Sequence, residues 1–152
     1  MSLSSNSPPI AVIDVETTGL FPFRQDRIIE MAAVIVRPDG AVEREFDSLI
    51  NPARDVGATR IHGLTSQDIL QAPRFEEIAG LLMEVLEGTV AVAAHNVRFD
   101  RQFLESELSR LGFALPDCLS VCTMQLAGGG KLSECCQDYG IAPESAYHHA
   151  LA

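Results

Sequence analysis

The segment Ile28–Val36 (IIEMAAVIV) is apolar at every position except Glu30. An apolar run of this length predicts a mostly buried strand. Two more strands are expected beside it. One is Ile10–Asp14 (IAVID), an apolar run that ends in an acid, and the other is Val42–Ile50, which alternates loosely and follows a turn signal at 38–40. We expect the three strands to form an antiparallel meander.

The remainder of the chain alternates between helical and strand patterns. Asn51–Gln71 is rich in loop residues, with one short helix expected after Thr65, a residue suited to a helix N-cap. The apolar spacing then predicts a helix over 73–87, a strand over 90–94, a helix over 98–111, a short strand over 119–122 and a helix over 131–139. This order predicts an α/β domain in which helices pack on a mixed sheet.

Length and charge narrow the class of protein. With 152 residues, of which 47% are hydrophobic, the chain fits one domain over 10–152, and the small polar residues 1–9 are expected to form a flexible leader. No apolar run approaches the ~20 residues that a membrane-spanning helix needs. A net charge of −10 argues against a nucleic-acid binder that relies on Lys and Arg alone, unless divalent cations hold the phosphates.

The cysteines lack the spacing of zinc-finger or redox sites. Cys118, Cys122, Cys135 and Cys136 include no CxxC pair. The first residues also lack the charged start and apolar stretch of a signal peptide. We therefore expect reduced thiols and a cytoplasmic protein.

Asp14 and Glu16 lie two positions apart on an expected strand, so their carboxylates face the same side. Two such carboxylates repel each other unless protons or cations intervene, and carboxylate oxygens are the ligands that Mg²⁺ and Mn²⁺ prefer. A solvated strand end with two acids would show the same pattern. From these two residues alone, both interpretations stay open.

A second group of polar residues, His95–Asp100 (HNVRFD), begins the helix expected after the strand over 90–94. Asp100 falls in the first turn, where an acid is electrostatically favoured. It also shares a face with Leu104 and Leu108, which are expected to pack inward, and an inward-facing acid is unusual without a partner. Helix capping and metal binding are both compatible with this position.

A third group lies at the end of the sequence, where Tyr147–Ala152 (YHHALA) carries two adjacent histidines. Imidazole titrates near neutral pH, so a histidine close to bound metal ions could act as a general base. Exposed histidines without a function are the alternative.

Together these groups resemble the DEDDh 3′–5′ exonucleases of the ribonuclease H-like superfamily, which includes the proofreading epsilon subunit of bacterial DNA polymerase III, ribonuclease T and oligoribonuclease. The matching motifs are Asp14-x-Glu16-Thr17-Thr18-Gly19-Leu20, Ile61-His62-Gly63-Leu64-Thr65 and His95-Asn96-x-x-Phe99-Asp100, in the family's order. The resemblance covers nearly all of residues 9–152 and is strongest to the epsilon-type members. It implies a ribonuclease H-like mixed sheet, with the antiparallel meander followed by parallel strands.

The resemblance also implies roles for individual residues. His148 would be the general base, because His148 followed by Ala150 fits the family's spacing and His149 does not. The metal ligands, which are also catalytic, would be Asp14, Glu16 and Asp100, holding two Mg²⁺ or Mn²⁺ ions. The substrate-binding residues would be Thr17, Thr18, Leu20, His62 and Asn96, with Phe99 supporting the site from the core.

The implied activity is hydrolysis of phosphodiester bonds at the 3′ end of DNA, in proofreading or repair, with two metals clamping the attacking and leaving oxygens. The expected partners are single-stranded or frayed 3′ ends and a polymerase subunit. An RNA 3′-end exonuclease and a non-catalytic nucleic-acid or polymerase-binding module are the alternatives. The family's fourth acid would follow directly after Ala152, so we expect the domain to be truncated before that acid and the last helix of the family.

Overall fold

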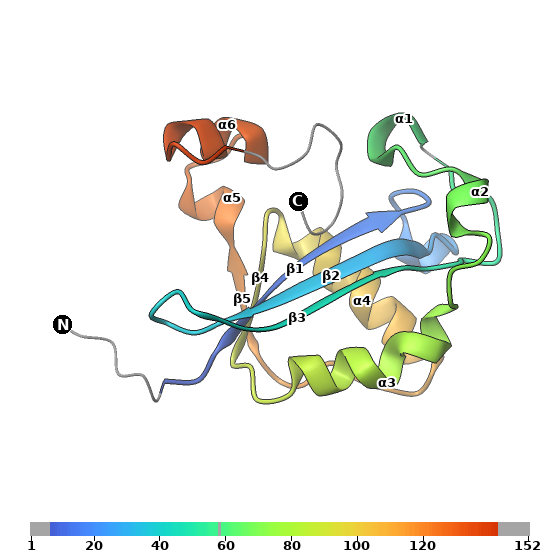
Figure 1. Cartoon of the computed structure of the whole chain (residues 1–152), viewed down its shortest axis with the longest axis horizontal. Helices are drawn as coiled ribbons and strands as arrows, with labels where there is room; N and C mark the ends of the chain where they lie inside the picture. Colours follow the sequence, from blue (N-terminus) through green and yellow to red (C-terminus); the bar gives the residue numbers. More distant parts are fainter. Residues whose placement is uncertain (1–6, 58, 143–152) are drawn as a thin grey trace.

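The computed structural model describes residues 7–57 and 59–142. Five strands form one mixed sheet in the order β3-β2-β1-β4-β5 (Figure 1). The strands are β1 (Ile10–Thr17), β2 (Ile28–Val36), β3 (Val42–Leu49), β4 (Ala91–Ala94) and β5 (Leu119–Cys122). The predicted α/β fold class with a mixed sheet is confirmed, and the order places β1 at the centre.

The antiparallel meander is confirmed. β2 pairs with β1 from Ile10↔Val36 to Thr17↔Ile28, and with β3 on its other side. Because β2 lies between two strands and is covered by side chains, its apolar residues have little exposure, as the run Ile28–Val36 predicted. β4 and β5 add in parallel, as expected for strands joined by helical crossovers.

Two helices cover one face of the sheet. They are α3 (Phe75–Leu86) and α4 (Val97–Arg110), and Figure 1 shows both on the same side. The inward-facing residues of the central strands, such as Ile13 and Val15, pack against Phe75, Leu82 and Phe103 in one hydrophobic core. The odd-numbered residues of β1 therefore enter the core, while the even-numbered Asp14 and Glu16 face the opposite side.

The opposite face of the sheet is partly open. Helices α5 (Thr123–Leu126) and α6 (Leu132–Asp138) flank it, and a cavity of about 470 Å³ lies between them and the strands. Its lining is mostly apolar and includes Val12 and Val34, together with Asp14. All four cysteines lie in the described residues, and each is a free thiol.

The boundaries and short helices differ from the sequence-based prediction. β1 continues to Thr17 because β2 pairs with it as far as Thr17↔Ile28, past a register shift after Glu16. The loop-rich stretch after β3 contains not only α2 (Ser66–Ile69), capped by Thr65 as predicted, but also α1 (Thr59–His62). The 3₁₀ turn η1 (Pro22–Arg24) and α5 were also missed, because single turns carry no apolar periodicity. In the described part of the chain, no helix is long and apolar enough to cross a membrane.

Candidate active site

The candidate site lies where β4 separates from β1. The two strands pair in parallel from Ile10↔Ala91 to Val12↔Ala93, and β4 ends one residue later at Ala94. Beyond that point the backbone N–H of Val15 has no strand partner on this side and donates instead to Oδ1 of Asp100, at 3.1 Å. This is the carboxyl end of two parallel strands, where open α/β sheets bind their ligands.

Asp100 reaches this position from the first turn of α4. Asn96, the residue before the helix, adopts a left-handed conformation with φ 77°, so the chain turns sharply out of β4 into α4. The turn brings Asp100, only 3% exposed, against β1, where its carboxyl interacts with that of Asp14. The turn therefore places Asp14 and Asp100 side by side, although they are 86 positions apart in the sequence.

The carboxyls of the site hold protons more tightly than ordinary acids do. Burial raises the pKa of Glu16 to about 8, and the negative charge of Asp14 adds to the effect. Burial also raises the pKa of Asp14 and of Asp100, and for Asp100 the charge of Asp14 is the next cause. Asp14 lies on the free face of the sheet, on the side away from the main core. The site is thus a cluster of acids in need of positive charge.

Glu30 is an acid of this site that the sequence analysis did not assign. It lies opposite Glu16 in the β1–β2 register, is 5% exposed, and its charge raises the pKa of both Asp14 and Glu16. A signal was present in the sequence, because Glu30 is the only charged residue in the run Ile28–Val36. A single acid inside a buried strand indicates a functional or paired group, as the inward-facing Asp100 does.

The donor set suits hard divalent cations. Asp14, Glu16 and Asp100 offer only carboxylate oxygens, which Mg²⁺ and Mn²⁺ prefer. The salt bridges among residues 7–57 and 59–142 involve other acids, so no Lys or Arg is paired with these three there. Within the same residues, however, no three His, Cys, Asp or Glu side chains already converge as a complete metal cage. The residues therefore fit a metal by chemistry and charge, and their side chains would have to turn toward it.

A stability measurement should reveal this charge cluster. The pKa of Glu16 is 4.5 in an ordinary setting and about 8 in the folded protein. Between these two pH values the unfolded chain releases a proton that the folded chain keeps. Metal-free protein should therefore lose stability as the pH rises through this range, with a melting temperature lower by on the order of 5 °C. Asp14 and Asp100 shift in the same direction.

Thermal melts in excess EDTA at several pH values would measure this loss, and Glu16→Gln should flatten the profile. Saturating Mn²⁺ should restore stability at high pH, since a bound cation favours the ionised carboxylates. A metal-free melting temperature that rises steadily toward pH 8 would contradict the charge cluster.

The predicted substrate-binding residues at the end of β1 and just after it differ in their exposure. Thr17 and Thr18 are 9% and 7% exposed, and both hydroxyls are engaged inside the protein: Thr17 donates to Gly19 O at 2.7 Å, and Thr18 donates to Asp26 at 3.0 Å. Leu20, by contrast, is 67% exposed. The two threonines thus stabilise the conformation of residues 17–21 through internal hydrogen bonds, whereas the side chain of Leu20 is accessible to a ligand. Their substrate contacts stay predictions.

His62 and Asn96, the other predicted substrate-binding residues, also differ. His62 is 1% exposed, its Nε2 lies 3.2 Å from Val56 O, and its Nδ1 accepts the N–H of Leu64 at 3.0 Å. Both ring nitrogens therefore hold the loop around α1, and a substrate contact by His62 would require that loop to open. Asn96 is exposed at the start of α4, so its contact with substrate stays a prediction.

Phe99 and His148 are the remaining residues that the prediction names. Phe99 is half-buried, packs on the main core and stacks on Phe103 in a tilted pair with ring centroids 4.9 Å apart, as a supporting residue would. His148, the predicted general base, and His149 lie outside the described residues. The structure thus describes the carboxylates of the candidate site, and the assignment of His148 as the general base stays a prediction.

The fold and the comparisons with known proteins define a ribonuclease H-like nuclease domain. Residues 11–152 match the family model RNase T, described as exonuclease, and the chain belongs to this family of 3′–5′ exonucleases. It is 37% identical over 124 residues to the 3′–5′ exonuclease DinG of Bacillus subtilis, covering 80% of this chain and 13% of that protein. It is also 37% identical over 150 residues to a DNA polymerase III subunit epsilon-like protein of Rhodobacter capsulatus, covering 92% of this chain and 21% of that protein.

Solved structures agree on the fold. Escherichia coli exonuclease I in complex with a dA16 oligonucleotide matches with a TM-score of 0.73 and 17% sequence identity, over 93% of this chain and 38% of that one. The predicted family and the predicted ribonuclease H-like fold are therefore confirmed. This chain corresponds to only part of each of these proteins, since it spans between 13% and 38% of their lengths.

Proposed function

We propose that this domain hydrolyses the terminal phosphodiester bond at the 3′ end of single-stranded or frayed DNA and releases nucleoside monophosphates, in proofreading or repair. The observation that carries the proposal is the meeting of Asp14 and Asp100 beside Glu16 at the carboxyl ends of β1 and β4. DNA is favoured as substrate because the relatives include a DNA polymerase III epsilon-like protein, and exonuclease I was solved with oligodeoxynucleotides. A polymerase subunit is the proposed protein partner.

Different residues would bind the metal ions, contact the substrate and accept a proton. Asp14, Glu16 and Asp100 would hold two Mg²⁺ or Mn²⁺ ions, while the exposed Leu20 would contact the terminal nucleotide. His148 would take the proton of the attacking water. The cations would supply the positive charge that offsets the negative charge developing on the phosphate in the transition state. Without them, four clustered acids would repel the phosphodiester, since Glu30 adds its charge to the other three.

The test uses DNA and RNA oligonucleotides of matched sequence, labelled at the 5′ end and incubated side by side with the full-length protein and Mg²⁺ or Mn²⁺. We expect DNA ladders that shorten one nucleotide at a time from the 3′ end, together with released mononucleotides. Excess EDTA should abolish the reaction. Internal cuts, or activity that survives EDTA, would contradict the proposal, and a clear preference for RNA would replace its substrate.

A further inference from the structure

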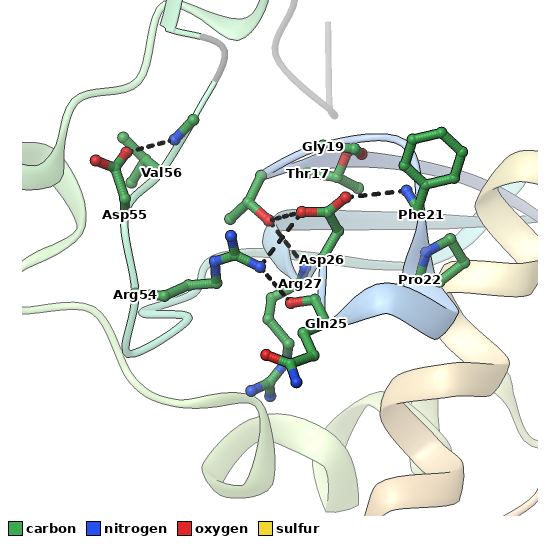
Figure 2. Close-up of polar contacts among 12 residues, drawn as sticks. Thr17, Gly19, Phe21, Pro22, Gln25, Asp26, Arg27, Arg54, Asp55 and Val56 are labelled. Carbon is green, nitrogen blue, oxygen red and sulfur yellow. Dashed lines mark hydrogen bonds and ion pairs between the residues drawn. The ribbon is translucent and has the colours of Figure 1, made fainter.

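The segment 17–21 joins the carboxylates of β1 to the exposed side chain of Leu20, and one acid outside the carboxylate cluster holds it. Asp26 accepts a hydrogen bond from the Thr18 hydroxyl to Oδ1, at 3.0 Å, and another from the backbone N–H of Phe21 to Oδ2, at 3.0 Å. Figure 2 shows the Asp26 carboxylate between the backbone N–H of Phe21 and the side chain of Arg54. Both oxygens of Asp26 are thus used within this loop.

Arg54 ties the same carboxylate to a second loop. Its Nη1 lies 3.3 Å from Oδ1 of Asp26 and also donates to the carbonyl of Gln25. Gln25 has a left-handed backbone, with φ 79°, so the chain reverses there before it enters β2. Arg54 lies in the loop after β3, and the contact therefore joins the turn between β1 and β2 to that loop (Figure 2).

Two glycines lie where the segment 17–21 contacts Asp26 and the loop after β3, and neither position has room for a side chain. A Cβ placed on Gly19 would overlap the carboxylate of Asp26, and a Cβ placed on Gly57 would overlap the carbonyl oxygen of Thr18. Gly57 also has a left-handed backbone, with φ 72°, which disfavours any side chain there. The segment that carries Thr18 and Gly19 is therefore enclosed between Asp26 on one side and the loop after β3 on the other.

Leu20 lies between two backbone anchors of this arrangement. The carbonyl of Gly19, just before it, accepts the hydroxyl of Thr17, and the N–H of Phe21, just after it, donates to Asp26. Leu20 is 67% exposed although its backbone is held on both sides. An apolar side chain kept exposed and in one place is preorganised for a ligand, because little conformational freedom remains to be lost on binding.

We propose that Asp26 is a positioning residue for the 3′-terminal nucleotide: by joining Thr18, Phe21 and Arg54, it holds the segment 17–21 in the shape that presents Leu20. The inference rests on the proposed function, because it takes the terminal nucleotide as the ligand of Leu20. Asp26 touches no reacting group and acts through the backbone on either side of Leu20. Its loss should therefore weaken binding and leave the chemical step largely intact.

The test compares the wild type with Asp26→Asn, a variant of the same shape in which one acceptor becomes a donor. With a single-stranded DNA substrate, KM should rise about tenfold, and kcat should stay within about twofold. The dissociation constant for thymidine 5′-monophosphate, measured by calorimetry, should rise by a similar factor. Arg54→Ala should act in the same direction but more weakly, since Arg54 is 41% exposed.

A double-mutant cycle separates positioning from a general effect on the fold. If Asp26 acts through Leu20, Leu20→Ala should raise KM in the wild type and add little in the Asp26→Asn protein. Asp39→Asn is the matched control, because Asp39 also accepts a backbone N–H in a turn, from Ala41 at 3.0 Å, but between β2 and β3. Its KM should equal that of the wild type. Thermal melts would show that every variant compared is folded.

The outcomes distinguish this inference from the proposed function. A wild-type protein without metal-dependent exonuclease activity would contradict the proposed function. An active wild type, with a folded Asp26→Asn variant of unchanged KM and unchanged mononucleotide affinity, would overturn only the role of Asp26. Additive effects of Leu20→Ala and Asp26→Asn would likewise overturn it, since the two residues would then act independently.

Discussion

An Asp14→Asn variant is expected to lose at least about a hundredfold in kcat and to bind Mn²⁺ much more weakly. Asp14 lies at the centre of the cluster, because its charge raises the pKa of both Asp100 and Glu16. The amide keeps the shape of the side chain but removes an anionic ligand from the proposed metal site. Calorimetric titration with Mn²⁺ and single-turnover rates on end-labelled DNA would measure both effects.

The same variant should be more stable than the wild type when no metal is present. Removing one of several crowded acids relieves their repulsion, so the metal-free melting temperature at about pH 8 should rise while activity falls. Loss of activity together with gained stability separates a functional acid from a structural one. A variant that melts lower than the wild type under these conditions would indicate that Asp14 mainly supports the fold.

Asp47→Asn provides a control matched in chemistry and position. Asp14 and Asp47 both pair with Ala32, one from β1 and the other from β3, so they lie in one row across the sheet. Asp47 is exposed, and both substitutions remove the same charge. Its activity and Mn²⁺ affinity should stay close to those of the wild type. Equal losses in the two variants would point to the overall charge of this face rather than to a metal ligand.

The sequence was most informative where a pattern repeats along one element. The run Ile28–Val36 predicted β2 to the residue, because both faces of a central strand are covered. The even-numbered acids of β1 and the inward-facing Asp100 could be recognised because each breaks a regular apolar pattern. These acids indicated where a site could lie, and the resemblance to the exonuclease family then assigned their roles.

The sequence was least informative where contacts join distant loops. Asp26 lies in a polar turn that resembles any other, and its partner Arg54 is 28 positions away. His62 belongs to a motif that suggested a substrate contact, yet the structure uses both of its ring nitrogens to hold backbone groups. Residues near an active site can occur in a motif because they touch the substrate or because they shape the loop, and burial is what distinguishes the two roles.

Glu107 lies between these two extremes. Its spacing from Asp100 indicates that it faces inward, but only the structure shows its partners. It lies seven positions after Asp100 on α4, two turns along the same face, and is 2% exposed. Its carboxylate accepts from Arg27 Nε at 2.7 Å and Nη2 at 2.8 Å, and from the N–H of Ile28 at 3.1 Å. The hydrogen bond to Ile28 joins α4 to the start of β2, the strand that forms the centre of the meander.

Glu107→Ala is therefore expected to destabilise the fold by about 3 kcal/mol, the lower end for a broken buried pair because Arg27 remains 23% exposed. The guanidinium of Arg27 and the N–H of Ile28 would both lose their acceptor. For a domain of this size the melting temperature should fall by on the order of 10 °C. Denaturant unfolding and thermal melts at neutral pH would measure the loss.

Glu105→Ala on the same helix is the matched control. Glu105 also pairs with an arginine at 2.7 Å, Arg101, but it is 45% exposed, and such pairs contribute at most about 1 kcal/mol. The two variants thus remove the same group from salt bridges of equal length in different surroundings. A large difference between them would assign the stability to burial and to the Ile28 hydrogen bond. Equal small losses would mean that water replaces Glu107, and that β2 is held to α4 by the apolar core alone.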